Sequence, residues 1–325
     1  MPVGIPSAIP AASTDVVTFL IPYMRWLTLI IAVIVTLTAA GVLGSTIPLL
    51  AWLPLPNWII WIAAVLSASV VVNELLGKPV PFLRWSFLRM MLGTKKMLIE
   101  WQVGDGREER VARKVLSNAR RGDADDVIRT IDDFAYQESF LMNVGDEKGK
   151  ILDAALERSH PRTILELGTY VGYSAIRMGR KLHEEGRLYS IEFKEANAAI
   201  ARKIINHAGL SDRVQVVVGT IGDGGKTLRY LESDCGFSAG TLDFVFIDNA
   251  KDAYLPDLLQ ILETGWFHRG SVVVADNILI PGVPEYRAYM KEQEGILWHS
   301  KEHRSHLEYQ SVLPDIVLES DYLGD

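Results

Sequence analysis

Hydrophobic and polar positions divide the chain into two parts of different character. Positions 26–73, 48 in all, contain no charged residue. One bilayer crossing takes about 20 apolar residues, so a run of this length predicts two crossings, and three prolines in its middle supply a break between them. We therefore expect two transmembrane helices at 27–77, after an N-terminal tail (1–26) and before a basic linker (78–103).

Basic side chains indicate how this hairpin is oriented. Five of them follow the second predicted span, whereas the loop between the spans is uncharged: Lys78, Arg84, Arg89, Lys95 and Lys96. Because positive charge favours the cytosolic side, we expect an integral membrane protein with its C-terminal domain (104–325) in the cytosol. A single crossing or a re-entrant segment would reverse that assignment. A buried core hairpin is the alternative, which so long an uncharged run disfavours.

The C-terminal part shows the periodicities of a soluble domain. Helical spacing of apolar residues comes first, at Glu109–Ala119, Asp125–Phe134 and Lys148–Glu157. Short apolar, β-rich runs then alternate with helical stretches, at Thr163–Glu166, Leu188–Glu192, Val214–Val218, Phe244–Ile247 and Ser271–Ala275. Such alternation predicts an α/β fold with a doubly wound, mostly parallel sheet. Two further β-like runs, 296–301 and 315–320, are too close for a crossover helix and predict an antiparallel edge pair.

Charge and cysteine content exclude some functions. The first 100 residues hold six Lys or Arg and three Asp or Glu, so the other 225 hold 27 and 37, a net charge of −10. This acidic balance argues against a nucleic-acid partner. Cys235 is the only cysteine, so the chain can form neither an internal disulfide nor a cysteine-rich zinc site.

A glycine-containing loop follows the first predicted strand, with the sequence Glu166-Leu-Gly168-Thr-Tyr170-Val-Gly172-Tyr-Ser174. Glycines there allow a sharp turn and close approach to a ligand, although an ordinary strand-to-helix turn has the same composition. The loop lacks the middle glycine of the dinucleotide fingerprint, which disfavours a nicotinamide dehydrogenase. Glu192 ends the second predicted strand, where an acid can accept the hydroxyls of a ribose or cap a helix.

Oxygen-bearing side chains close two later strands. Asp248 follows the fourth predicted strand, and Asp276 and Asn277 follow the fifth. In a parallel sheet these ends adjoin, and three oxygen ligands suit Mg²⁺, whereas an Asp-Asn pair alone is more typical of a turn.

Lys251 lies three residues after Asp248. A divalent cation beside it would disfavour the ammonium form, which makes Lys251 a candidate general base. Glu308, in His306-Leu307-Glu308-Tyr309, would by itself be interpreted as an ordinary edge-strand residue.

Several motifs together resemble the catechol O-methyltransferase family in order and spacing, from about 104 to 320. They are Met142-Asn-Val-Gly-Asp-Glu-Lys-Gly149, the loop 165–174, Asp248 with Lys251, Ala275-Asp-Asn277 with Pro281-Gly282, and Leu307-Glu-Tyr309. The resemblance implies a seven-stranded, Rossmann-like methyltransferase domain with S-adenosylmethionine and Mg²⁺ as cofactors. It further implies that both oxygens of a small-molecule catechol chelate the metal while one of them is methylated.

The resemblance also implies roles for individual residues. Contacts to the methyl donor are implied for Met142, Val144, Glu166, Gly168, Tyr170, Ser174, Glu192 and Asp248. Asp248, Asp276 and Asn277 would bind the metal. Lys251 would be the catalytic base, and Glu308 would accept a hydrogen bond from the second catechol hydroxyl.

This sequence departs from the family pattern at two positions of the expected substrate wall. Phe140 and Ala250 stand where the family has tryptophan, which predicts a wider pocket and a bulkier catechol. Two alternatives stay open: a metal-dependent O-methyltransferase of other vicinal diols, and a membrane adaptor that keeps the donor pocket without catalysis.

Overall fold

The structure is a computed structural model, and it describes residues 105–324 together with Val65, 68–70, 72–73 and Arg84. The chain divides into two compact units, Met1–Trp85 and Ser86–Asp325, and the continuous described range belongs to the second. The predicted tail, membrane hairpin and linker lie outside the described residues, apart from the few before Asp105, and their boundaries stay predictions. Within the described residues, no helix is long and apolar enough to cross a membrane.

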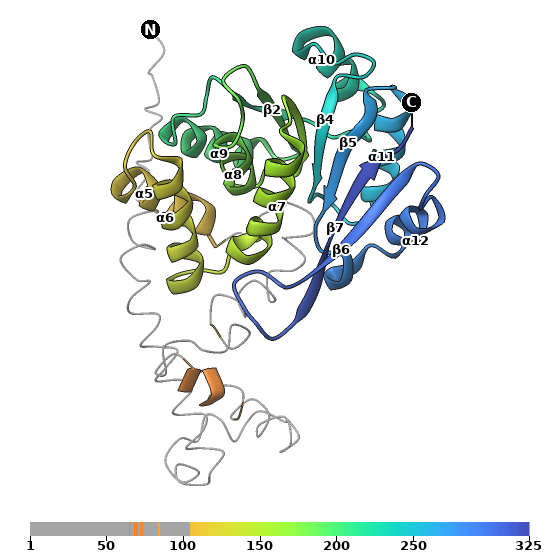
Figure 1. The fold of residues 1–325 in the computed structure, drawn as a ribbon. Helices are drawn as coiled ribbons and strands as arrows, with labels where there is room; N and C mark the ends of the chain where they lie inside the picture. The colour runs from red at the N-terminus through yellow and green to blue at the C-terminus, as the bar shows by residue number, and fades with distance from the viewer. Residues whose placement is uncertain (1–64, 66–67, 71, 74–83, 85–104, 325) are drawn as a thin grey trace, which may run out of the picture. The chain divides into compact units, whose positions relative to one another are not determined.

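A seven-stranded sheet forms the centre of the second unit, in the order β3-β2-β1-β4-β5-β7-β6 (Figure 1). Its strands are β1 (Thr163–Leu167), β2 (Arg187–Glu192), β3 (Val214–Val218), β4 (Leu242–Ile247), β5 (Phe267–Ala275), β6 (Trp298–His306) and β7 (Pro314–Tyr322). Strands β1 to β5 are parallel, and β7 runs antiparallel to both β5 and β6. The predicted doubly wound, mostly parallel sheet with an antiparallel edge pair is therefore confirmed.

Helices cover both faces of the sheet (Figure 1). One group consists of α5 (Arg107–Asn118), α6 (Ala124–Gln137), α7 (Gly145–Ser159), α8 (Tyr173–Gly179) and α9 (Glu195–His207). The other consists of α10 (Lys226–Cys235), α11 (Tyr254–Glu263) and α12 (Pro284–Glu292), with a short turn, η3 (Ile278–Gly282), after β5. The three helices expected before β1 are α5 to α7. Each begins one to three residues before its predicted start, and α6 does so because the Asp123 side chain caps it by accepting from Asp126 N at 2.9 Å.

Alternating strand residues build two separate hydrophobic cores. Ile164 and Phe246 pack into the core under α5 to α9, whereas their neighbours Leu165 and Ile247 pack into the core under α10 to α12. Successive side chains of a strand point to opposite faces, and both faces of this sheet are covered. This is why the central strands are nearly continuous runs of apolar residues.

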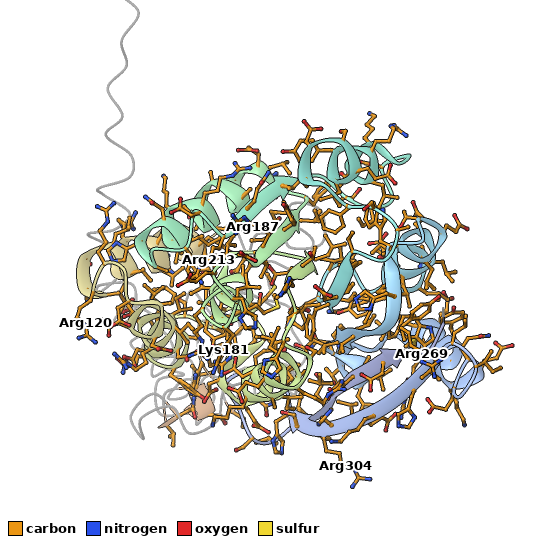
Figure 2. All side chains as sticks on the ribbon, turned by 45° about the horizontal axis from the view of Figure 1, so that its top comes forward. Arg120, Lys181, Arg187, Arg213, Arg269 and Arg304 are labelled. Atoms are coloured by element: carbon orange, nitrogen blue, oxygen red, sulfur yellow. The ribbon has the colours of Figure 1, made fainter. Side chains whose placement is uncertain are left out.

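Charged side chains lie mostly on the outside of this unit. The basic residues labelled in Figure 2 belong to different elements and loops, and all but the half-buried Arg213 are exposed: Arg120, Lys181, Arg187, Arg213, Arg269 and Arg304. Lys148 of α7 and Arg107 of α5 are among the exceptions, at 1% and 0% exposed. A buried cation needs nearby negative charge, so these two positions mark places where the fold has assembled polar groups inside.

Leu165→Ala in β1 should lower the free energy of unfolding by about 2–5 kcal/mol, because it leaves a cavity at a fully buried position in the middle of the sheet. Val218→Ala, at the 40% exposed end of the edge strand β3, should cost less than about 1 kcal/mol. Chemical denaturation followed by circular dichroism measures both. Equal losses for the two variants would contradict the central place of β1 in the core.

Candidate active site

Three side chains predicted as metal ligands lie together at one edge of the sheet. Asp248 directly follows β4, and Asp276 and Asn277 directly follow β5. These strands are parallel neighbours with Ile247 opposite Ala275, so both end at the same place. Asn277 takes a left-handed φ of 55°, which asparagine tolerates better than most residues. The expected placement is confirmed, and the role as ligands stays a prediction.

An ammonium group bridges two of these oxygen-bearing side chains. Nζ of Lys251 lies 3.0 Å from Oδ1 of Asp248 and 3.0 Å from Oδ1 of Asn277, and it donates to the Tyr254 hydroxyl at 2.6 Å. That hydroxyl in turn donates to the carbonyl oxygen of Asp276 at 3.2 Å. Oδ1 of Asp248 and Oδ1 of Asn277 are therefore close enough together to contact one cation. A divalent ion bound by both side chains would need the same arrangement.

The two carboxylate oxygens of Asp276 have different surroundings. Oδ1 accepts from the backbone N–H of Asn277 at 2.7 Å and lies 2.7 Å from Nζ of Lys148. Oδ2 is buried and has no hydrogen-bond partner among the described residues. Burial raises the pKa of this carboxyl, and the charge of Lys148 opposes the shift. An unpartnered buried oxygen is costly unless a ligand binds it, so the three side chains fit a hard cation such as Mg²⁺.

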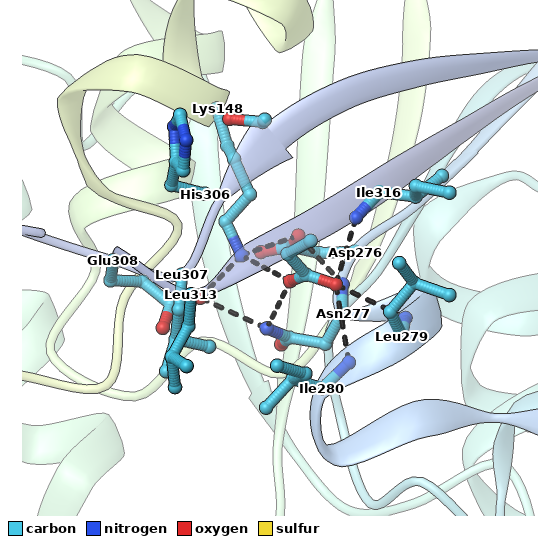
Figure 3. Close-up of polar contacts among 12 residues, drawn as sticks. Lys148, Asp276, Asn277, Leu279, Ile280, His306, Leu307, Glu308, Leu313 and Ile316 are labelled. Atoms are coloured by element: carbon cyan, nitrogen blue, oxygen red, sulfur yellow. Dashed lines mark hydrogen bonds and ion pairs between the residues drawn. The ribbon is translucent and has the colours of Figure 1, made fainter. Parts of the chain in front are cut away.

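Lys148 lies at the centre of a buried polar cluster (Figure 3). Its Nζ contacts the carboxylates of Asp276 at 2.7 Å, Asp315 at 3.1 Å and Glu308. The Asn277 amide nitrogen donates to Oε1 of Glu308 at 3.0 Å and to Oδ2 of Asp315 at 3.1 Å. Burial would lower the pKa of the Lys148 amine, but the three carboxylates raise it above its usual range, so the ammonium stays charged.

Asp315 connects this cluster to the backbone around it. Its Oδ1 accepts from the backbone N–H groups of Leu279, Ile280 and Ile316 at 3.1, 3.2 and 2.8 Å (Figure 3). The turn η3 is thereby tied to the start of β7. The cluster thus joins α7, the end of β5, the turn after β6 and the start of β7 in one network.

The glycine loop after β1 lies directly against the end of β4. Gly168 has φ 103°, and a Cβ atom there would lie 2.2 Å from the carbonyl oxygen of Asp248. Only glycine combines this backbone conformation with so close an approach. The loop expected to bind the donor and the strand end expected to bind the metal are therefore in contact through backbone atoms.

Two acids beside this loop hold its backbone and its tyrosine. The Glu192 carboxylate accepts from the backbone N–H groups of Tyr170 at 2.7 Å and Lys194 at 2.9 Å. Burial raises the pKa of Glu192, and these hydrogen bonds oppose that shift. The hydroxyl of Tyr170 donates to Oε1 of Glu108 in α5 at 2.9 Å. Both ends of Tyr170 are thus fixed by carboxylates.

Glu166 is fully buried within β1, and one of its oxygens has no hydrogen-bond partner among the described residues. Burial raises its pKa to about 8, although hydrogen bonds from Ser174 and Ser190 lower it. The carboxyl is therefore largely protonated at neutral pH. Val144 (2% exposed) precedes α7, and Met142 packs against the core nearby.

A profile of O-methyltransferases matches residues 121–297, more than half of the chain. The chain belongs to the O-methyltransferase family. A protein described as a probable O-methyltransferase of Mycobacterium tuberculosis is 57% identical over 235 residues, which cover 72% of this chain and 100% of that one. Catechol O-methyltransferase of Mus musculus is 37% identical over 65% of this chain and 77% of its own length.

The fold of this O-methyltransferase family member is the S-adenosylmethionine-dependent methyltransferase fold. The O-methyltransferase TomG of Streptomyces achromogenes, solved with S-adenosylmethionine, superposes with a TM-score of 0.50 at 22% identity. That superposition covers 67% of this chain and 99% of the other. The expectation of an α/β methyltransferase domain is therefore confirmed.

One structural expectation was wrong. Glu308 was expected in an edge strand, but β6 ends at His306 and Glu308 lies in the turn that follows. Tyr309, with φ 53°, cannot continue a strand. The turn is what directs the Glu308 carboxylate inward to Lys148.

Sequence reasoning missed Lys148, Asp315 and Glu108. A signal for Lys148 existed, because it lies four residues before Leu152 on the buried face of α7. Nothing comparable marks Asp315 or Glu108, since acids in a strand or in a first helical turn are ordinarily solvated.

Gly168→Ala should weaken S-adenosylmethionine binding at least tenfold and lower thermal stability, because the new methyl group collides with the backbone of Asp248. Gly224→Ala is the matched control: its φ is 75°, but nothing lies within 4 Å of the added Cβ. The control should lower the free energy of unfolding only by the cost of placing alanine in the left-handed conformation, about 1–2 kcal/mol. It should leave the affinity for S-adenosylmethionine unchanged. Isothermal titration calorimetry and thermal melts compare the two variants. Similar donor affinities would contradict the contact.

Glu166→Gln should abolish a pH dependence of stability. A carboxyl with a pKa of about 8 when folded and 4.5 when unfolded binds more protons in the folded state. Its contribution is therefore fully present below pH 4.5 and is lost as the pH rises toward 8, by about 3–5 kcal/mol. The unfolding free energy of wild type minus that of Glu166→Gln should fall between pH 5 and pH 8. A difference independent of pH would contradict a protonated Glu166.

Proposed function

We propose that this protein transfers a methyl group from S-adenosylmethionine to one hydroxyl of a catechol, with Mg²⁺ held by Asp248, Asp276 and Asn277. The observation that carries the proposal is the arrangement around Lys251. Its ammonium bridges Asp248 and Asn277, and the neighbouring residue in the chain, Asp276, has an oxygen, Oδ2, without a hydrogen-bond partner among the described residues. A cation-binding oxygen set and a lysine base thus occupy one place, with Glu308 alongside.

The residues divide the chemistry among them. A bound Mg²⁺ would acidify a catechol hydroxyl and orient both oxygens. Lys251, as a neutral amine, would take the proton, and Glu308 would accept a hydrogen bond from the other hydroxyl through its second oxygen, since Oε1 is engaged by Lys148 and Asn277. The transfer breaks one S–CH₃ bond and forms one O–CH₃ bond. Because the charges of donor and nucleophile cancel, alignment contributes more than charge stabilisation.

The donor would bind across the glycine loop. Gly168 lets the loop pack directly against the backbone of Asp248, and Glu192 lies at the end of β2, where a ribose is bound in folds of this kind. The carboxyl of Glu166 and the hydroxyl of Ser174 lie beside the loop and suit the polar methionine end. Tyr170, fixed at both ends, would form one wall of the donor site.

The catechol substrate is supported by the 37% identity to mouse catechol O-methyltransferase. Two positions favour a larger or more apolar catechol. Ala250 replaces one expected tryptophan with a methyl group. Phe140 replaces the other and is 5% exposed, with its ring packed edge-on against Tyr309 at 6.5 Å between centroids. A substrate wall without indole rings leaves room for substituents.

We also propose a membrane location for the protein, which the chain before the domain supports. The uncharged positions 26–73 are long enough for two membrane helices, and the basic residues after them favour a cytosolic domain. A membrane-anchored enzyme would meet an apolar catechol at the bilayer surface.

Lys251→Ala should lower methyl transfer by about 10²–10⁴-fold, the typical contribution of a general base, while donor affinity changes by less than about threefold. The assay follows the labelled methyl group from S-adenosylmethionine to a small catechol, with Mg²⁺ or with a chelator. Wild-type transfer should require the metal.

Lys291→Ala, which removes a solvent-exposed lysine of α12, is the control and should leave turnover unchanged. A panel of catechols and other vicinal diols determines the substrate class. Donor binding without transfer to any of them would contradict the proposed activity and favour an adaptor role. Methyl transfer that continues in the presence of the chelator would contradict the proposed requirement for Mg²⁺.

A further inference from the structure

A lysine buried among three carboxylates is not explained by the proposed chemistry. Lys148 is 1% exposed and contacts Asp276, Glu308 and Asp315. Burying such a group costs several kcal/mol per ion, and replacing a buried ion cluster by apolar residues is often neutral or stabilising. Stability alone therefore gives no reason for a charged cluster at this position in α7.

The cluster controls which oxygen of Asp276 is available to a cation. Lys148 and the backbone N–H of Asn277 both bind Oδ1, each at 2.7 Å. Oδ2 is buried and has no hydrogen-bond partner among the described residues. Two donors on one oxygen restrict rotation of the carboxylate, so Asp276 offers a single oxygen, as suits the strict octahedral geometry of Mg²⁺.

The same cluster controls the orientation of Asn277. Its amide nitrogen donates to Glu308 at 3.0 Å and Asp315 at 3.1 Å, the two carboxylates that Lys148 also binds. With the nitrogen committed to the cluster, Oδ1 points the other way, toward Lys251. An asparagine can ligate a hard cation only through that oxygen. The cluster thus sets two of the three proposed ligands.

We propose that Lys148 is a positioning residue of the active site. By binding Asp276, Glu308 and Asp315 together, it presents Oδ2 of Asp276 and Oδ1 of Asn277 to the metal and holds Glu308 beside the substrate hydroxyl. Lys148 itself would touch neither the methyl donor nor the catechol that accepts the methyl group. This inference rests on the proposed function, because it assigns the machinery that orients the ligands of that same site.

A simpler role for Lys148 would be neutralisation of buried negative charge. The two roles are separated by Lys148→Met combined with Asp315→Asn. This double variant removes one positive and one negative charge, so the net charge of the cluster is unchanged while the tether is lost. It is also expected to fold where Lys148→Met alone leaves three carboxylates unbalanced. Asp315→Asn alone reports what the change at that position does by itself.

Mn²⁺ binding to the full-length protein, measured by calorimetry and by electron paramagnetic resonance, is the readout besides activity. Wild type should bind one Mn²⁺. The double variant should bind it at least tenfold more weakly and show at least a tenfold lower kcat, with S-adenosylmethionine affinity within about threefold of wild type. Lys148→Arg keeps the positive charge and several hydrogen-bond donors, so it should lose less Mn²⁺ affinity and less kcat than the double variant. Lys150→Met, an exposed lysine of the same helix, should change neither.

The outcomes are distinguishable. If the double variant matches Asp315→Asn in Mn²⁺ affinity and kcat, Lys148 only balances charge and the inference is overturned while the proposed function stands. If wild type binds no Mn²⁺, the positioning role of Lys148 and the proposed metal-dependent function are both overturned. Loss of donor affinity in parallel with loss of Mn²⁺ affinity would indicate general damage to the site and would also overturn the positioning role.

Discussion

Charge buried at the carboxyl edge of the sheet has to be balanced there, and this requirement organises the site. Asp276 and Asp315 are almost fully buried, and Glu308 is 9% exposed. Lys148 brings a positive charge to these carboxylates from a helix that precedes every strand, so α7 is attached to the sheet by electrostatics as well as by its apolar face. The resulting network includes the turn after β5, where Asp315 accepts backbone N–H groups. Local backbone and buried charge therefore stabilise each other.

Close backbone contact links the two halves of the site. The glycine loop touches the carbonyl group of Asp248, so the loop and the end of β4 cannot shift independently. Glu108 adds a third element by accepting the hydrogen bond of Tyr170, which ties α5 to the same loop. In a methyl transfer whose rate depends on alignment, such rigid coupling matters more than any single strong interaction.

Sequence reasoning succeeded where the signal was periodic or where position along a strand was decisive. The alternation of apolar runs and helical stretches gave the parallel sheet, and the polar residues at strand ends gave Asp248, Asp276 and Asn277. Both depend on the fact that parallel strands end at one edge, which holds for the whole fold class. Residue roles came from resemblance to a family, because no spacing by itself distinguishes a metal ligand from a turn residue.

The sequence by itself determined the fold class, the family and the strand-end residues, because these follow from local pattern and motif order. Only the tertiary structure decided that Lys148 meets Asp315, 167 residues further along the chain. The physical reason is that a charged residue in a helix or strand has the same local signature whether it is solvated or buried, and burial depends on which elements pack together. The same holds for Glu308. Its carboxylate points inward because the residue lies in a turn, and the β-like residues around it gave no sign of that turn in the sequence.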